Sequence, residues 1–288
     1  MNALRYLASS AMLAIAVASW PEVIKGDGYV YNGGVVAGQP DGYGVCRYDN
    51  GTTYYGLWSK GKRNGLGRLR FADDTFEFGT WKNGIYQPVK GQKFIVGRSC
   101  YGIDVSKYQK AVSWTALSLP ANAVGKVLPS GSRTPYRQPV LFALMKSTQG
   151  TTVKDPTFAQ NFAEARRCGI IRGAYHFLSV LSPAKKQAAE FIANTPLESG
   201  DLPPVLDLEI DKATMQRDHA KVVAMAKEWL SIIEKHYGVK PIIYTYNNYY
   251  IDYLRGHGLD SYDYWIARYG AAPTARRRHS EQSNSWHR

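Results

Sequence analysis

Two carboxylates stand two positions apart at the end of a short apolar segment. This segment, residues 202–209, has a pair of prolines near its start and carries Asp207 and Glu209 at its end. Because side chains at positions i and i+2 of a strand point to the same face, the two carboxylates are expected side by side, about 6–7 Å apart along the backbone. Like charges in a partly dry site raise the pKa of one group, so that one acid stays protonated beside an ionised partner. The pair predicts acid–base hydrolysis; the alternative is two solvated carboxylates where a strand meets a loop.

The elements that would position this pair alternate between strands and helices from residue 98 onward. Strands are expected at residues 100–105, 140–146, 170–178, 202–209, 241–245 and 264–267, and helices at 156–168, 182–194 and 218–237. Residues 118–138 read as a long loop near the site. This alternation predicts an α/β fold with a mainly parallel sheet covered by helices.

Further polar and aromatic residues fall at the expected strand ends. Asp104, His176 and Tyr244 do so together with the acid pair, and catalytic groups of such folds lie at the carboxyl ends of strands. Acids beside aromatic rings, without a histidine cluster of the metal-binding type, favour a carbohydrate site where rings stack on sugars and carboxylates cleave the bond. No metal and no cofactor are expected, and His176 is expected to orient its neighbours rather than to react.

The composition of the 288 residues excludes some classes of protein. The apolar fraction of 44% is ordinary for a globular protein, and no apolar run reaches the ~18 residues of a membrane span, which excludes a polytopic membrane protein. The net charge of +13 predicts attraction to polyanions, which include nucleic acid, anionic lipid and acidic cell-wall polymer. Nucleic acid ranks last and is not expected as a partner, because no zinc-finger spacing, phosphate-binding loop or basic helix with interleaved aromatics occurs.

The N-terminal residues suggest export. In residues 1–26, Arg5 precedes an apolar run and Ala16-Val17-Ala18 offers a cleavage site of small residues, which indicates a signal peptide and an exported protein of the periplasm, cell envelope or medium. The alternative is a buried N-terminal helix. The odd number of cysteines implies no disulfide framework; one bridge between Cys100 and Cys168 is conceivable, and buried thiols are favoured.

Residues 27–86 repeat with a fixed period. Gly33, Gly56 and Gly79 are separated by equal steps, and Trp58 recurs as Trp81 at the same step. Each unit reads as strand, glycine-containing turn and strand, so the segment is expected to form a row of β-hairpins with aromatic rings between neighbours. Residues 54–67 resemble the MORN repeat, which implies a spacer or scaffold, or alternatively a surface that contacts an anionic membrane or another protein.

The chain from residue 98 to 270 resembles the family 25 glycoside hydrolases, the N-acetylmuramidase type of lysozyme. The matching motifs occur in the family's order at residues 102–109, 142–150, 155–156, 161–162, 173–177, 204–209, 241–245 and 265–269. The resemblance implies a modified TIM-like β/α barrel that cleaves the β-1,4 bond between N-acetylmuramic acid and N-acetylglucosamine in peptidoglycan glycan strands, without a metal. The chain then divides into the N-terminal segment 1–26, the repeats 27–86, a linker 87–97, the barrel 98–270 and a basic polar tail 271–288.

The resemblance also implies roles for individual residues. Glu209 would be the general acid, Asp207 would stabilise the developing positive charge or orient the acetamido group of the substrate, and Asp104 would line the same cleft. The remaining expected substrate contacts are Tyr175, Tyr244, Trp265 and Lys146. For the tyrosines the alternative is core packing, and for Lys146 it is a charge that extends from a strand end.

The sequence departs from the family pattern in two places. Gln149 stands where the family commonly carries a glutamate, which removes a negative charge near the cleft. After Tyr269 no strand-like apolar run follows, whereas the family continues with strands that bear a further aspartate, so the barrel is expected to lack its last strands. The alternative function is therefore a non-catalytic cell-wall-binding protein or a truncated inactive relative, with the repeats as a scaffold.

Overall fold

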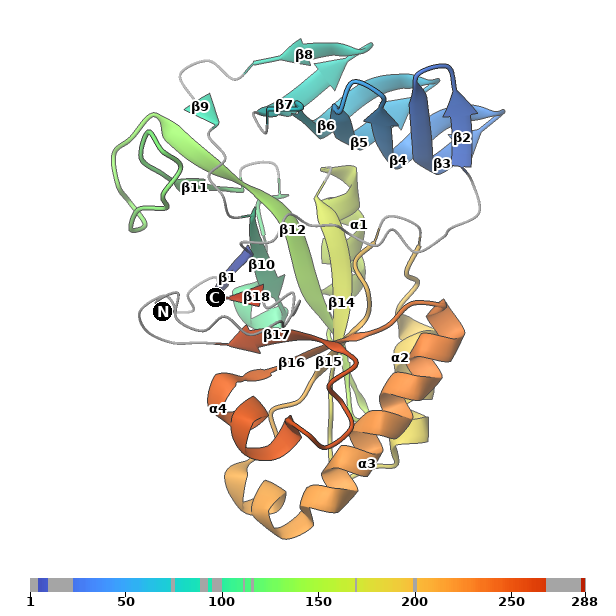
Figure 1. The fold of residues 1–288 in the computed structure, drawn as a ribbon, viewed down its shortest axis with the longest axis vertical. Coiled ribbons are helices and arrows are strands. Elements are labelled where there is room, and N and C mark those ends of the chain that lie inside the picture. The colour runs from blue at the N-terminus through green and yellow to red at the C-terminus, as the bar shows by residue number, and fades with distance from the viewer. Residues whose placement is uncertain are drawn as a thin grey trace.

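The computed structural model contains two β-sheets and three long helices (Figure 1). It describes residues 5–9, 23–73, 76–88, 93–94, 100–110, 112–114, 117–168, 170–198, 201–267 and 286–287. Most of the predicted N-terminal segment, most of the linker and nearly all of the basic tail lie outside these residues. None of the described helices is long and apolar enough to cross a membrane.

The repeats form one antiparallel sheet in which every strand pairs with its neighbour in sequence, so the predicted row of hairpins is confirmed. We call it the repeat sheet. Its strands are β2 (Val23–Gly26), β3 (Tyr29–Val36), β4 (Gln39–Tyr48), β5 (Thr53–Ser59), β6 (Lys62–Arg70), β7 (Phe76–Lys82) and β8 (Ile85–Gln87). The repeated glycines make room for aromatic rings. A Cβ atom on Gly67 would lie 2.2 Å from the Tyr54 hydroxyl, and one on Gly44 would lie 2.3 Å from the Tyr31 hydroxyl.

One face of the repeat sheet holds a row of buried rings. Trp58 meets Tyr31 and Tyr54 edge to face with centroids 5.3 and 5.2 Å apart, and Trp81 meets Tyr54 at 5.2 Å. Edge-to-face pairs at this spacing are attractive beyond the area they bury. The predicted packing of aromatics between hairpins is thus observed.

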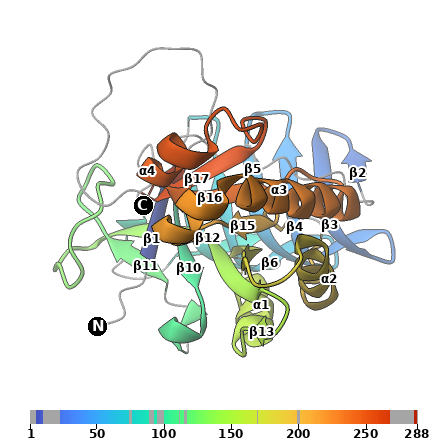
Figure 2. The ribbon, with the colours of Figure 1, turned by 90° about the horizontal axis from the view of Figure 1, so that it is seen from below.

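The second sheet is the curved wall of a β/α barrel. Its parallel strands are β10 (Cys100–Val105), β12 (Tyr136–Gln149), β14 (Ile171–Phe177), β15 (Val205–Asp207), β16 (Ile242–Tyr246) and β17 (Asp263–Ala267), each paired with the next. The helices α1 (Phe158–Arg167), α2 (Ala184–Asn194) and α3 (Lys212–Tyr237) surround the strands (Figure 2). The short helices α4 (Asn247–Tyr249) and η3 (Tyr250–Leu254) follow β16.

Two short strands lie between β17 and β10. The backbone of β18 (Trp286–His287) pairs in parallel with β17 through two residues, and β1 (Arg5–Ser9) pairs antiparallel with β10 through five. Among the described residues, this two-residue β18 is the one strand after β17, and it lies in the segment where the sequence predicted a polar tail. Because strand edges in barrels are normally paired along their length, this part of the wall is held by few hydrogen bonds.

Alternate residues of the barrel strands face two different clusters. The outer cluster, which contains Ile103, Leu206 and Ile243, packs under the helices. The inner cluster contains Phe142, Leu144, Val205, Ile242, Tyr244 and Trp265. Strand side chains alternate between faces with a period of two, so membership of a cluster identifies the face of each residue.

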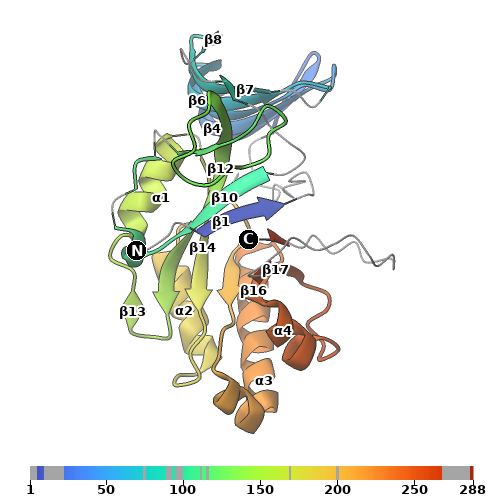
Figure 3. The same cartoon turned by 90° about the vertical axis from the view of Figure 1, so that its left-hand side faces the viewer.

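The repeat sheet packs against the inner cluster. Tyr43, Val45 and Phe78, at most 8% exposed, belong to it together with the barrel residues. Figures 1 and 3 show the repeat sheet at the end where β12 and β14 begin, opposite to the end where parallel strands carry catalytic groups. The predicted spacer is therefore in apolar contact with the base of the barrel.

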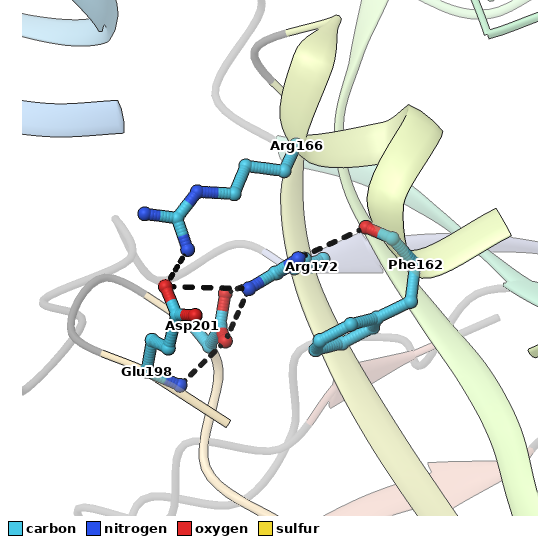
Figure 4. Close-up of polar contacts among 5 residues, drawn as sticks. All are labelled: Phe162, Arg166, Arg172, Glu198 and Asp201. Carbon is cyan, nitrogen blue, oxygen red and sulfur yellow. Dashed lines mark hydrogen bonds and ion pairs between the residues drawn. The ribbon is translucent and has the colours of Figure 1, made fainter. Parts of the chain in front are cut away.

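A buried ion-pair network holds the loop before β15 (Figure 4). Arg172 at the start of β14 donates from Nε and Nη2 to Asp201 over 2.7 and 3.2 Å, and its guanidinium lies 3.8 Å from the centroid of the Phe162 ring. Arg166 pairs with Glu198 in the same loop. Burial raises the pKa of the Asp201 carboxyl, and the guanidinium groups of Arg172 and Arg166 oppose that rise. The network holds Glu198 and Asp201, and thereby the chain segment that leads into β15, in place.

Several boundaries differ from the sequence expectations. The predicted loop 118–138 begins with the short strand β11 (Ser118–Pro120), which pairs with an extended β12. Helix α3 begins at Lys212 because Asp211 caps it by accepting from Thr214 N over 2.9 Å, whereas the expected start, Asp218, is a non-helical residue inside it. Cys46 and Cys168 are free buried thiols, so the alternative Cys100–Cys168 bridge is excluded.

Candidate active site

The predicted acids lie on the inner face at the carboxyl ends of their strands. Asp104 alternates on β10 with Ile103 and Val105, which belong to the outer cluster, so Asp104 faces inward. Asp207 follows the inner residue Val205 by two positions and ends β15. Both aspartates are buried, with 7% and 8% exposure. The predicted strand 202–209 is shorter than expected, and Glu209 lies two residues beyond its end.

Backbone hydrogen bonds hold the segment that carries the two acids on both sides. Leu178 N donates to Asp207 O over 3.0 Å, and Leu208 N donates to Tyr244 O over 2.9 Å. The buried hydroxyl of Thr245 donates to Leu208 O over 2.9 Å. These bonds continue the pairing past the last strand residue and keep the backbone of the acid pair fixed. One carboxylate oxygen of each acid, Asp207 Oδ1 and Glu209 Oε1, is inaccessible to solvent.

Lys146 reaches this site because β12 is irregular. The pairing between β12 and β14 shifts between Lys146 and Thr148, which leaves Ser147 as the extra residue of a bulge. A regular strand would direct residues 146 and 149 to opposite faces, whereas here Lys146 Nζ donates to Gln149 Oε1 over 2.6 Å. Burial lowers the pKa of the Lys146 ammonium, and the charges of Asp207, Asp155 and Glu209 oppose that shift. Lys146 is thus the cation that faces the acid pair.

The predicted aromatic contacts fall into two groups by exposure. Tyr244 pairs directly with Asp207 on one side and with Trp265 on the other, and the two rings lie with centroids 4.4 Å apart. Both are nearly buried, with 2% and 3% exposure, so their rings form the floor beside Asp207. Tyr175 is half-buried and pairs with Lys146 across β12 and β14. Of the three rings, Tyr175 is the most accessible to a ligand.

His176 lies on the opposite face, as its position next to Tyr175 requires. It is fully buried between Thr148 and Gln187, with Nδ1 2.7 Å from Thr148 Oγ1 and Nε2 3.0 Å from Gln187 Oε1. Its ring stacks on Trp229 with centroids 5.4 Å apart. Burial lowers the pKa of His176 to about 4. The side chain joins the sheet to α2 and α3, so the structure separates it from the acid pair with which the sequence grouped it.

The structure adds residues that the sequence patterns did not assign to the site. The bond between Lys146 and Gln149 depends on the bulge, which has no signal in the sequence. Asp155, which precedes the predicted helix 156–168, accepts from Lys107 N over 2.8 Å. Within the described part of the chain, no group of three or more histidine, cysteine or acidic residues could hold a metal ion. The site therefore offers acids, one cation and aromatic rings.

Comparisons with known families give two matches. The family model described as "Glycosyl hydrolases family 25" matches residues 103–287, more than half of the chain. The MORN repeat model matches residues 31–53 and 54–76. The two matches occur in the predicted order.

The chain is also similar to individual proteins. The protein named "Uncharacterized protein YegX" of Escherichia coli O6:H1 is 34% identical over 186 residues, which are 64% of this chain and 62% of that protein. "Lysozyme M1" of Streptomyces globisporus is 26% identical over 60% of this chain and 56% of its own length. A family 25 glycosyl hydrolase structure from Bacillus anthracis is similar with a TM-score of 0.48 and 27% identity, over 60% of this chain and 72% of that one. The chain spans less than two thirds of the length of the two curated relatives, YegX and Lysozyme M1.

Proposed function

This chain belongs to the glycosyl hydrolases of family 25, and on that premise we propose that it hydrolyses the β-1,4 bond between N-acetylmuramic acid and N-acetylglucosamine in peptidoglycan. One observation carries the proposal. The parallel strands β10, β12 and β15 bring Asp104, Lys146 and Asp207 to the inner face of the barrel, toward the carboxyl ends of these strands. Acids converge there beside the rings of Tyr244 and Trp265, as a carbohydrate-cleaving site needs.

In the proposed mechanism, Glu209 donates a proton to the oxygen of the leaving sugar. Glu209 lies just past the strand end, outside the regular hydrogen-bond ladder, where a carboxyl can reach a ligand above the sheet. Asp207 stabilises the positive charge that develops on the sugar ring, or orients its acetamido group. Asp104 lines the same cleft. Lys146 offsets the repulsion between the acids, since its charge interacts with both Asp207 and Glu209.

The proposed substrate contacts are the aromatic residues of the inner face. Tyr175 presents a half-buried ring that a sugar can approach, whereas Tyr244 and Trp265 support Asp207 from below. A Tyr175→Ala variant would therefore raise KM more than it lowers kcat, and Tyr244→Ala would lower kcat because the backing of Asp207 is lost.

The experiment that tests the reaction identifies the new chain ends. The full chain is incubated with peptidoglycan, the products are reduced with borohydride, and mass spectrometry distinguishes the reduced sugars. Reduced N-acetylmuramic acid at new ends supports the proposal. Reduced N-acetylglucosamine assigns the opposite bond and contradicts it.

The second candidate is a non-catalytic cell-wall-binding protein. Within the described residues, the wall after β17 consists of the two-residue β18 and the pairing of β1, and this observation favours it. The same incubation separates the two functions. Sedimentation of the protein with peptidoglycan, without any new reducing ends, is the outcome that supports binding alone.

Export and a further contact of the repeats are also part of the proposal, because peptidoglycan lies outside the cytoplasm. Buried clusters occupy part of both faces of the repeat sheet, so contact with an anionic membrane or a protein would use its exposed turns and outer strands. Sedimentation of the full chain with anionic vesicles at physiological salt tests the membrane contact, and absence of binding removes it.

A further inference from the structure

A cavity of about 560 Å³ lies between the segment that follows β10 and helix α1. Its walls come from the described residues of two parts of the chain, 107–110 with 112–114 and 156–167. The charged and aromatic residues that line it include Lys107, Lys110, Trp114, Glu164 and Arg167. We call it the lysine groove. Its volume falls within the range of small-molecule sites, roughly 300–1,000 Å³. None of these residues has a role in the proposed cleavage.

Hydrogen bonds at both ends hold the walls of the lysine groove together. At one end the buried carboxylate of Asp155 accepts from Lys107 N over 2.8 Å and from Thr157 N over 2.9 Å, which joins η1 (Lys107–Gln109) to the start of α1. At the other end Trp114 Nε1 donates to Asn161 Oδ1 over 3.3 Å. The groove is therefore formed before any ligand enters, which reduces the ordering cost of binding.

The charges of the lysine groove are not balanced. Arg167 is neutralised by Glu164, since Nη2 and Oε2 lie 2.6 Å apart. No carboxylate of the described residues forms an ion pair with the ammonium group of Lys107 or Lys110. Two ammonium groups beside a preformed cavity attract an anion.

The backbone at Lys110 adds a second observation. Its φ of 58° and ψ of −140° lie in a region that residues other than glycine rarely adopt. A glycine would avoid this strain, but the position carries a long cationic side chain that lines the groove. Strained backbone of this kind concentrates at binding sites.

The lysine groove adjoins the candidate active site. Lys107 follows the end of β10 by two residues, and its charge interacts with Lys146, which in turn interacts with Asp207 and Glu209. In a glycan strand bound over the acid pair, the substituents of the sugar rings would therefore lie near the lysine groove. Muramic acid carries a peptide through its lactyl group, and that peptide ends in carboxylates.

We propose that the lysine groove binds the carboxylates of the peptide attached to the muramic acid of the substrate. This inference rests on the proposed function, and it makes the enzyme select glycan that still carries its peptides. Lys107 and Lys110 hold the carboxylates as point charges, and the side chain of Gln160 lines the same cavity as a further hydrogen-bond donor.

Calorimetric titration of the full chain tests the groove without catalysis. The anionic probe is N-acetylmuramyl-L-alanyl-D-glutamate and the neutral probe is di-N-acetylchitobiose. The double variant Lys107→Gln/Lys110→Gln is expected to weaken binding of the anionic probe about tenfold or more and to leave the neutral probe unchanged. Lys186→Gln, an exposed lysine on α2, is the matched control and should change neither.

The variant Lys110→Gly distinguishes an effect of the lost charge on binding from an effect of lost stability. It removes the ammonium and relieves the backbone strain, so the melting temperature should rise while affinity for the anionic probe falls. Equal weakening for both probes, or no weakening of the anionic one, overturns the proposal. Displacement of the anionic probe by millimolar inorganic phosphate also overturns it, because the groove would then serve phosphate. Should the wild type cleave nothing, the proposed function fails, while the titrations still decide the role of the groove.

Discussion

Lys146 Nζ donates to Gln149 Oε1 over 2.6 Å, so the ammonium that faces the acid pair is hydrogen-bonded to a neutral amide. Its positive charge therefore remains available to Asp207 and Glu209, with which it interacts. The bulge at Ser147 creates this arrangement by returning residue 149 to the inner face.

A first prediction concerns the charge at this position. Gln149→Glu adds a carboxylate beside Lys146 and near the acid pair, which disfavours ionisation of the general acid. The basic limb of the pH–activity profile should move upward by about half a unit to one unit. Gln39→Glu, which adds the same charge at an exposed site in the repeat sheet, should leave the profile in place. Equal profiles for both variants would show that residue 149 does not act on the acids.

A second prediction uses the buried His176. Its pKa is lowered to about 4 in the folded state, whereas an unfolded histidine titrates near 6.5. Above pH 6.5 both states are neutral, so the contribution to stability is fully present there. As the pH falls from about 6.5 to about 4 only the unfolded state gains a proton, and about 3 kcal/mol of stability is lost.

Urea unfolding at several pH values measures this effect. The difference in unfolding free energy between wild type and His176→Gln should shrink between pH 6.5 and pH 4, because only the wild type has the titrating group. Other groups, including Asp201, are present in both proteins and cancel. A difference that stays constant over this range would contradict the burial of a neutral imidazole.

A third prediction concerns the hydroxyl of Tyr43. This atom is buried without a hydrogen-bond partner among the described residues, and burial raises the pKa of the phenol. Tyr43→Phe should leave thermal stability unchanged or raise it by about 1 kcal/mol, since the cost of an unpaired buried polar group disappears. Tyr31→Phe is the matched control, because the Tyr31 hydroxyl donates to Gly34 O over 2.7 Å and its loss should destabilise. Destabilisation by Tyr43→Phe that equals the control would disprove the interpretation.

A fourth prediction tests the contact between the repeat sheet and the barrel. Phe78→Ala should lower the unfolding free energy of the full chain by about 3 kcal/mol, because the ring belongs to the inner cluster of the barrel. Ile85→Ala, at a side chain that is 68% exposed, should have little effect. Calorimetry should show the sheet and the barrel melting in one transition. Two separate transitions, with the upper one unaffected by Phe78→Ala, would contradict a stabilising contact between the repeat sheet and the barrel.

Much of the barrel could be predicted because its strands keep a period of two. That period brings Asp104, Asp207 and Tyr244 to one face. His176, which the sequence groups with them at the strand ends, lies instead on the other face between Thr148 and Gln187. The period of two fails on β12, where the bulge at Ser147 changes the face of every later residue. The helical apolar pattern likewise misplaces the start of α3. The cap formed by Asp211 and the non-helical backbone of Asp218 are local features that an apolar pattern does not detect.

Contacts between distant parts of the chain were beyond the sequence patterns. The repeat period predicts hairpins but not the partner of their outer face, which depends on Tyr43 and Phe78 meeting barrel residues far along the chain. The lysine groove likewise depends on Asp155 and Trp114 joining two segments. Such contacts follow from the packing of whole elements rather than from local propensity.

The role of Glu209 as the acid of a peptidoglycan hydrolase is tested by counting new N-acetylmuramic reducing ends. These ends are compared for wild type, Glu209→Gln and Glu228→Gln, which changes an exposed glutamate of α3. We expect wild type and Glu228→Gln to release them at similar rates, and Glu209→Gln to be slower by a factor on the order of 10²–10⁴. Release by wild type that does not exceed release by Glu209→Gln would contradict this role.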